Sequence, residues 1–116
     1  MAPVRIRLTG IRAAGHHGAN PGERDQPQEF EVDLEVAVDP RGDHIDDTTD
    51  YRVLRETVQR TVAEQSHQLV ETIARSVVDA VRVDPRVLSA TAVVHKPAAT
   101  RSLGVADVAV EATWSA

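Results

Sequence analysis

Two segments near the N-terminus, residues 4–9 and 29–38, alternate apolar and polar side chains with the period of a β-strand. A period of two places the apolar side chains on one buried face and the polar ones in water. The polar positions carry arginines in the first segment and mostly carboxylates in the second, so opposite charges can meet across paired strands. The pairs that we expect between these antiparallel strands are Arg5 and Arg7 with Glu31 and Asp33.

Two later segments follow the spacing of an amphipathic α-helix. Residues 51–65 carry apolar side chains three and four positions apart, and residues 69–81 carry a longer apolar stripe. The second helix should end before Pro85, because the residue ahead of a proline avoids helical backbone angles. Ser66 is expected to cap its N-terminus, since a serine hydroxyl can accept a hydrogen bond from the first turn.

The C-terminal part of the chain contains two further strand patterns. Residues 87–96 are rich in Val, Ala and Thr, and this strand should stop at Pro97. Residues 98–104 are interpreted as a loop, and the alternation over 108–114 predicts a fourth strand. The order ββααββ is typical of an α+β fold, here an antiparallel four-stranded sheet with two helices on one face.

Such a sheet leaves one face and two edges uncovered. Open strand edges invite pairing with another chain, and closing several sheets into a barrel removes them. We therefore expect the chain to be one domain, residues 1–116, that assembles into an oligomeric barrel.

The composition narrows the class of protein. Hydrophobic residues make up 41% and charged residues 27% of the chain, an ordinary balance for a globular domain. A net charge of -5 with both signs scattered argues against a nucleic-acid partner, which needs a clustered basic surface. No apolar run is long enough to span a membrane, and arginines interrupt the N-terminal segment where a signal peptide has its apolar core. The absence of cysteine excludes disulfides and thiolate metal sites, and we expect a cytoplasmic protein.

Lysine usage singles out one position. Of the 13 basic residues, Lys96 is the only lysine. Arginine stays protonated in proteins, whereas a lysine can give up its proton, so a solitary lysine is a candidate for proton transfer. The alternative is that one lysine has remained by chance in an arginine-rich chain.

The five histidines do not predict a metal site. None are spaced as in the common histidine metal motifs, and the adjacent His16 and His17 point in opposite directions if the chain is extended. We expect no metal and no other cofactor, and expect His17 with Gly18 to fix the loop that contains them.

Four motifs occur in one order along the chain: GHHGANPGER-x-x-x-Q-x-F-x-V-D-L at 15–34, D-T-T-D-Y at 47–51, L-V-E-T-I-A at 69–74 and V-H-K-P at 94–97, with a weaker D-V-A-V-E at 107–111. In this order and spacing they resemble the dihydroneopterin aldolase family, over essentially the whole chain. The family subunit is the ββααββ unit called the tunnelling fold, or T-fold. The resemblance implies a homo-oligomer, a tetramer or octamer, with sites shared between neighbouring subunits.

The resemblance also implies a reaction. Family members act in folate biosynthesis as lyases, splitting 7,8-dihydroneopterin into 6-hydroxymethyl-7,8-dihydropterin and glycolaldehyde by a retro-aldol reaction without metal or Schiff base. The ring imine of the pterin accepts the electrons of the broken C–C bond. The protein then supplies positioning and general acid–base chemistry.

For substrate binding, the resemblance implies that Glu71 anchors the pterin, helped by backbone groups of Val70 and Thr49. A carboxylate can accept two adjacent N–H donors from an aminopyrimidinone edge. The alternative for Glu71 is a solvated carboxylate stabilised at a helix N-terminus.

For catalysis, the resemblance implies Lys96, Glu23 and Tyr51. Lys96 would shuttle a proton, Glu23 would shape the site and contact the end of the substrate, and the Tyr51 hydroxyl would meet the substrate side chain. Their alternatives are an exposed charge at a strand end, a solvated loop carboxylate and a tyrosine packed on the core.

Several positions depart from the family pattern. A second proline-containing stretch after Pro97 is replaced by Ala98 to Arg101, and Asp50 stands where histidine is common. These changes leave open a pterin-binding or purely structural paralogue without turnover. The resemblance itself leaves open a second rival, an epimerase acting on dihydroneopterin or its triphosphate, for which Arg24 and Arg101 are the candidate phosphate contacts.

Overall fold

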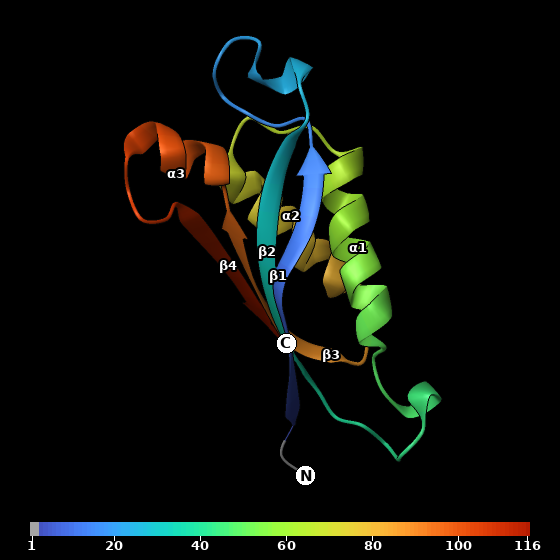
Figure 1. Cartoon of the computed structure of the whole chain (residues 1–116). Helices are drawn as coiled ribbons and strands as arrows, with labels where there is room; N and C mark the ends of the chain where they lie inside the picture. Colours follow the sequence, from blue (N-terminus) through green and yellow to red (C-terminus); the bar gives the residue numbers. More distant parts are fainter. Residues whose placement is uncertain (1–2) are drawn as a thin grey trace.

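The structure is a computed structural model that describes residues 3–116, so residues 1 and 2 of the expected domain lie outside the described part. It contains a four-stranded sheet and three α-helices within those residues (Figure 1). The strands are β1 (Val4–Gly15), β2 (Gln28–Val38), β3 (Val87–His95) and β4 (Ala109–Ser115). The helices are α1 (Tyr51–Glu64), α2 (Val70–Val81) and α3 (Pro97–Leu103), and short 3-10 turns occur at Glu23–Asp25 and Ile45–Asp47.

The sheet has the order β1-β2-β3-β4, and every neighbouring pair is antiparallel. Helices α1 and α2 cover one of its faces, as Figure 1 shows. The predicted α+β sheet with two helices on one face is therefore confirmed. β1 and β4 are the two edges of the sheet.

The core lies between the two long helices and the sheet. The apolar positions of β2 that alternate in the sequence are almost fully buried, and so is the stripe of α2. Burial of these apolar side chains is the main contribution to the stability of a sheet packed against helices. The core side chains of these two elements are Phe30, Val32, Leu34, Val36, Val38, Ile73, Ala74, Val77, Val78 and Val81.

The expected charge pairs between β1 and β2 are wrong in register. Arg5 lies opposite Ala37 and Arg7 opposite Glu35, and both arginines contact the Glu35 carboxylate at 3.3 Å. The pairing shifts between Leu8 and Ile11, where Gly10 adopts a left-handed φ of 73°. A bulge changes the register of a strand pair, and periodicity alone does not locate it.

Two further expectations are corrected by the structure. Ser66 does not cap α2: its hydroxyl donates to the carbonyl oxygen of His16 at 2.7 Å, and Leu69 is the N-cap residue, without a side-chain bond. Residues 98–104 are not an irregular loop, because Pro97 to Leu103 form α3. Pro97 occupies the start of that helix, where its missing N–H costs nothing, and Gly104 ends it with φ 68°.

Candidate functional site

Lys96 and Glu23 form an ion pair at one end of the molecule. Lys96 directly follows β3, and Glu23 begins the 3-10 turn in the loop between β1 and β2. The Lys96 Nζ donates to Glu23 Oε2 at 2.7 Å, and the two side chains are only 13% and 20% exposed. Partial burial strengthens a charge-assisted hydrogen bond, because less water competes for the two groups.

The main chain holds Lys96 from two sides. Its N–H donates to the carbonyl oxygen of Val108 at 3.0 Å, and its own carbonyl accepts from Thr100 N–H in α3 at 3.1 Å. The Thr100 hydroxyl joins the two sides, since it accepts from Val108 N–H at 3.0 Å and donates to the Lys96 carbonyl at 3.2 Å. Helix α3, which the sequence pattern missed, therefore fixes the position of Lys96.

Glu23 is held by its own loop as well as by Lys96. Its carboxylate accepts from Asn20 N–H at 3.3 Å and from the Gln28 amide at 3.2 Å. The hydrogen bond from Lys96, followed by those from Asn20 and Gln28, lowers the pKa of Glu23 below its usual value. The carboxylate is thus kept ionised beside the ammonium.

Gly18 makes room for the Glu23 side chain. A Cβ on Gly18 would overlap the carboxyl group of Glu23, and Gly18 has φ +148°, a conformation that other residues rarely adopt. This steric role was not recognised from the sequence. The GHHG segment contained the signal, since a glycine beside buried polar groups often marks a close approach.

His17 holds the same loop through hydrogen bonds to the main chain. It is 2% exposed, accepts from His67 N–H at Nδ1 (3.0 Å) and contacts the Val62 carbonyl through Nε2 (2.8 Å). A ring nitrogen that accepts an N–H bond carries no proton, so the imidazole is neutral with its proton on Nε2. Burial is the main reason that the pKa of His17 is lowered. Gly18 N–H also donates to the His67 carbonyl at 2.9 Å, and the expectation that His17 and Gly18 fix the loop is confirmed.

Glu71 lies near the same end of the molecule, in the first turn of α2. That helix begins three residues after His67, which holds the Gly18 loop. Glu71 is exposed and lines a groove of about 260 Å³ between α2 and the edge strand β4, and Val70 beside it is half-buried. The N–H groups of the first helical turn point out of this end of α2 and favour an anionic or hydrogen-accepting group there.

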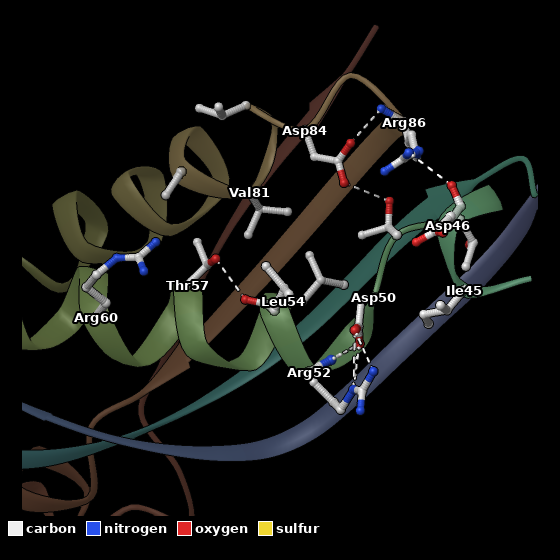
Figure 2. A pocket seen from close by; sticks show the side chains of 15 residues that line it. Ile45, Asp46, Asp50, Arg52, Leu54, Thr57, Arg60, Val81, Asp84 and Arg86 are labelled. Atoms are coloured by element: carbon white, nitrogen blue, oxygen red, sulfur yellow. Dashed lines mark hydrogen bonds and ion pairs between the residues drawn. The ribbon is translucent and has the colours of Figure 1, made fainter.

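Thr49 and Tyr51 lie at the other end of the molecule. Thr49 is 3% exposed, and its hydroxyl donates to Asp84 Oδ2 at 3.0 Å. Thr49 and Asp84 line an open pocket of about 730 Å³ between the start of α1 and the end of α2 (Figure 2). Tyr51, the first residue of α1, is 58% exposed.

Two arginines donate hydrogen bonds around this second pocket. Asp50 caps α1 by accepting from Arg52 N–H at 2.9 Å, and the Arg52 guanidinium contacts the same carboxylate at 2.9 Å. Hydrogen bonds from Arg52 lower the pKa of Asp50. The Arg86 guanidinium donates to the main-chain carbonyl oxygen of Asp46 at 3.1 Å, and Figure 2 shows both contacts.

The six residues singled out in the sequence therefore fall into two groups. Lys96, Glu23, Glu71 and Val70 lie at the end where α1 finishes, whereas Thr49 and Tyr51 lie where α1 starts (Figure 1). The 14 residues of α1 separate the groups, which corresponds to about 20 Å along a helix axis. A small molecule cannot contact both groups within one subunit.

In residues 3–116 no three His, Asp or Glu side chains gather as ligands of a metal ion would. None of the described helices is long and apolar enough to cross a membrane.

The chain is similar to known proteins over nearly its full length. The family model FolB, dihydroneopterin aldolase, matches residues 6–113. The chain is 34% identical over 110 residues to a dihydroneopterin aldolase of Streptomyces coelicolor, covering 91% of this chain and 92% of that protein.

Two solved structures show the same fold. Escherichia coli dihydroneopterin aldolase in complex with neopterin has a TM-score of 0.87 at 22% identity, covering 97% of this chain and 99% of that one. A dihydroneopterin aldolase from a Burkholderia species, bound to guanine, has a TM-score of 0.81 at 19% identity, covering 99% and 93% of the two chains.

Proposed function

The chain belongs to the dihydroneopterin aldolase family, and on this premise we propose that it is a lyase of folate biosynthesis. It splits 7,8-dihydroneopterin into 6-hydroxymethyl-7,8-dihydropterin and glycolaldehyde. We place its action in the cytoplasm.

The reaction needs protons moved at two points of the substrate. The 2′-hydroxyl loses its proton, the C1′–C2′ bond breaks, and its electrons pass into the ring imine while glycolaldehyde leaves. The exocyclic carbon then takes up a proton to give the hydroxymethyl product. Because the pterin ring itself accepts the electrons, general acid–base catalysis and positioning are sufficient.

The observation that carries the proposal is the Lys96–Glu23 pair with its 2.7 Å bond. A partly buried ammonium beside an ionised carboxylate can hold a water molecule and pass a proton between substrate and water. Lys96 is assigned the proton transfer, and Glu23 contacts the hydroxyl end of the substrate. The Tyr51 hydroxyl meets the substrate side chain.

Glu71 is proposed as the pterin anchor. The neopterin and guanine bound in the two solved relatives share an aminopyrimidinone edge. Its two adjacent N–H donors match one carboxylate, and the backbone groups of Val70 and Thr49 complete the contacts. The exposed position of Glu71 in the groove along β4 leaves its carboxylate accessible to a ligand.

The complete site is proposed to require a second copy of the chain. Tyr51 and Thr49 reach the substrate from a neighbouring subunit, because they lie too far from Lys96 of their own subunit. Large apolar side chains are exposed at both ends, which is typical of surfaces that become covered. They include Leu69, Leu103 and Val105 at one end and Ile45, Tyr51 and Val53 at the other. A ring of four subunits, or two stacked rings, would also pair the free edges of β1 and β4.

The direct test is to incubate the purified protein with 7,8-dihydroneopterin and separate the products by chromatography. Formation of 6-hydroxymethyl-7,8-dihydropterin and glycolaldehyde, slowed roughly a hundredfold or more by Lys96→Ala, is the expected result. Lys96→Arg is the matched control for charge, and it should also be slow because arginine does not release its proton. Monapterin as the sole product would instead identify an epimerase, and no product with pterin bound would contradict the aldolase.

The anchor has a separate test in pterin binding. Glu71→Gln keeps the size of the side chain but loses the charge and one acceptor oxygen, so affinity should fall about tenfold or more. Glu64→Gln, the same change at the exposed last residue of α1, is the control. Unchanged pterin affinity in Glu71→Gln would exclude this assignment.

A further inference from the structure

The imidazole of His95 bridges two carboxylates on the sheet face that the helices leave uncovered. Its Nε2 lies 2.8 Å from Asp33 Oδ2, and its Nδ1 lies 2.8 Å from Asp107 Oδ2. An ionised carboxylate only accepts hydrogen bonds, so both ring nitrogens must carry protons to satisfy both contacts. Burial on its own would lower the pKa of His95, but the bonds to Asp33 and Asp107 outweigh it and raise the pKa.

Other groups around the imidazole have the same sign as these carboxylates. Glu31 of β2 lies directly opposite His95, and Glu111 of β4 lies opposite Val93 on the same face. Lys96, the adjacent cation, points to Glu23 instead. The surroundings of His95 therefore favour the imidazolium form.

The two carboxylates belong to separate parts of the fold. Asp33 stands in the middle of β2, and its other oxygen accepts from Gly10 N–H at the bulge of β1, at 2.8 Å. Asp107 lies in the segment between α3 and β4. His95 thus connects the centre of the sheet to the segment between α3 and β4.

That segment is the one that holds the Lys96 main chain. Val108, next to Asp107, accepts the Lys96 N–H through its carbonyl at 3.0 Å and donates to the Thr100 hydroxyl. Beyond His95 the register of β3 with β2 ends, and Pro97 has no N–H with which to extend it. The Lys96 main chain is therefore held by Val108 and by α3, and Val108 is the direct neighbour of Asp107.

We propose that His95 is a positioning residue that acts through Lys96. Clamped between Asp33 and Asp107, it fixes the end of β3 and the Asp107–Val108 segment, and so aims the Lys96 ammonium at Glu23 and the substrate. This role rests on the proposed aldolase reaction, in which Lys96 transfers the proton. A displacement of about 1 Å in such a group is enough to cost a large part of the rate.

The kinetic test compares His95→Gln with the unchanged protein. A glutamine cannot donate to both carboxylates at once in the geometry of the imidazolium, so kcat should fall roughly ten- to hundredfold while KM stays within about twofold. Asp107→Ala should lower kcat similarly, and Asp107→Asn, whose amide oxygen still accepts from Nδ1, should restore most of it. His44→Gln, the same change at an exposed histidine, serves as the control with full activity. Unchanged kcat in His95→Gln would overturn the proposal.

A second readout does not depend on turnover, because Lys96 is the only lysine of the chain. In protein grown with lysine labelled at ¹³Cε, all Cε–Hε signals come from this one carbon. In the unchanged protein the two Hε protons should be inequivalent, since the ammonium is held by Glu23, and in His95→Gln they should merge as the side chain rotates freely. Signals that stay inequivalent in His95→Gln would contradict the positioning role. If the unchanged protein forms no aldolase product, the proposed reaction is wrong. The spectrum still tests whether His95 positions Lys96, because it does not depend on turnover.

Discussion

The His17 imidazole donates a hydrogen bond to the carbonyl oxygen of Val62 over 2.8 Å and so joins the end of β1 to the last turn of α1. Its other ring nitrogen receives the His67 N–H, which precedes α2. One neutral side chain therefore connects three segments beneath the loop that carries Glu23. We therefore expect His17 to contribute both to the stability of the protein and to the geometry of the Lys96–Glu23 pair.

Replacing His17 with phenylalanine should destabilise the fold. Phenylalanine keeps an aromatic ring against Phe30, which His17 meets edge to face at 5.4 Å, but it leaves the Val62 carbonyl and the His67 N–H without their partner. The free energy of unfolding should fall by about 2 kcal/mol, to be measured by urea denaturation. His44→Phe, at an exposed histidine, should change it much less. Equal losses in the two variants would mean that the buried bonds contribute nothing specific.

The stability of the protein should also depend on pH through His17. The pKa of His17 is lowered in the folded protein from its ordinary value of 6.5, so the unfolded chain binds a proton more readily than the folded one. Its contribution to stability is complete above about pH 6.5 and is lost as pH falls towards the lowered folded value. Unfolding curves between about pH 7.5 and 5 should show this loss, and His17→Phe should reduce it. An identical pH slope in both proteins would show that His17 does not account for it.

Gly18→Ala should displace Glu23 from Lys96. The added Cβ overlaps the Glu23 carboxyl group, which must move away from Lys96, and the backbone at φ +148° becomes strained. We expect kcat for dihydroneopterin cleavage to fall about tenfold or more, with stability reduced by about 1–3 kcal/mol. Gly42→Ala, in the Pro40–Asp50 connection, is the matched control, since a Cβ there meets only the end of the Asp47 side chain. A fully active Gly18→Ala protein would show that Glu23 can leave Lys96 without consequence.

Mixed oligomers should reveal that the site is shared. Lys96→Ala and Tyr51→Phe are each expected to be nearly inactive when purified alone. Suppose that a site takes Lys96 from one subunit and Tyr51 from its neighbour. In an equal mixture, the probability that the first subunit carries Lys96 is one half, and the probability that the neighbour carries Tyr51 is also one half, so about a quarter of the sites are complete. Subunits co-refolded in equal amounts should therefore regain roughly a quarter of the normal activity. No recovery in verified mixed oligomers would place both residues in sites built from one chain.

The sheet could be predicted because the apolar side chains of its buried face recur at every second position within one short segment of the chain. In β2 every apolar residue of the alternation is buried, and the motif around Lys96 predicted where β3 ends. The register of β1 could not be predicted, since the bulge at Gly10 depends on a contact with Asp33, 23 residues away. Helix α3 was missed because seven residues are too few to establish a helical period.

The candidate site could be predicted only residue by residue. Lys96 and Glu23 were each singled out, but their contact joins positions 73 residues apart, and nothing local in the sequence encodes it. The clamp at His95 was missed for the same reason, because Asp33 is 62 residues from it. The distance of Tyr51 from Lys96 within one subunit appears only when α1 is placed between them.

Trp114 gives the molecule an optical property of its own. It is the only tryptophan, it stands half-buried on the edge strand β4, and the Arg82 guanidinium lies 4.5 Å from its ring centre. It also lines the groove that contains Glu71. Its emission therefore comes from a single place, beside the proposed pterin anchor and on an edge that a neighbouring subunit would cover. The tryptophan fluorescence of the unlabelled protein can then report both events in one sample. Its intensity should fall when a ligand quenches it, and its emission wavelength should shift when subunits assemble.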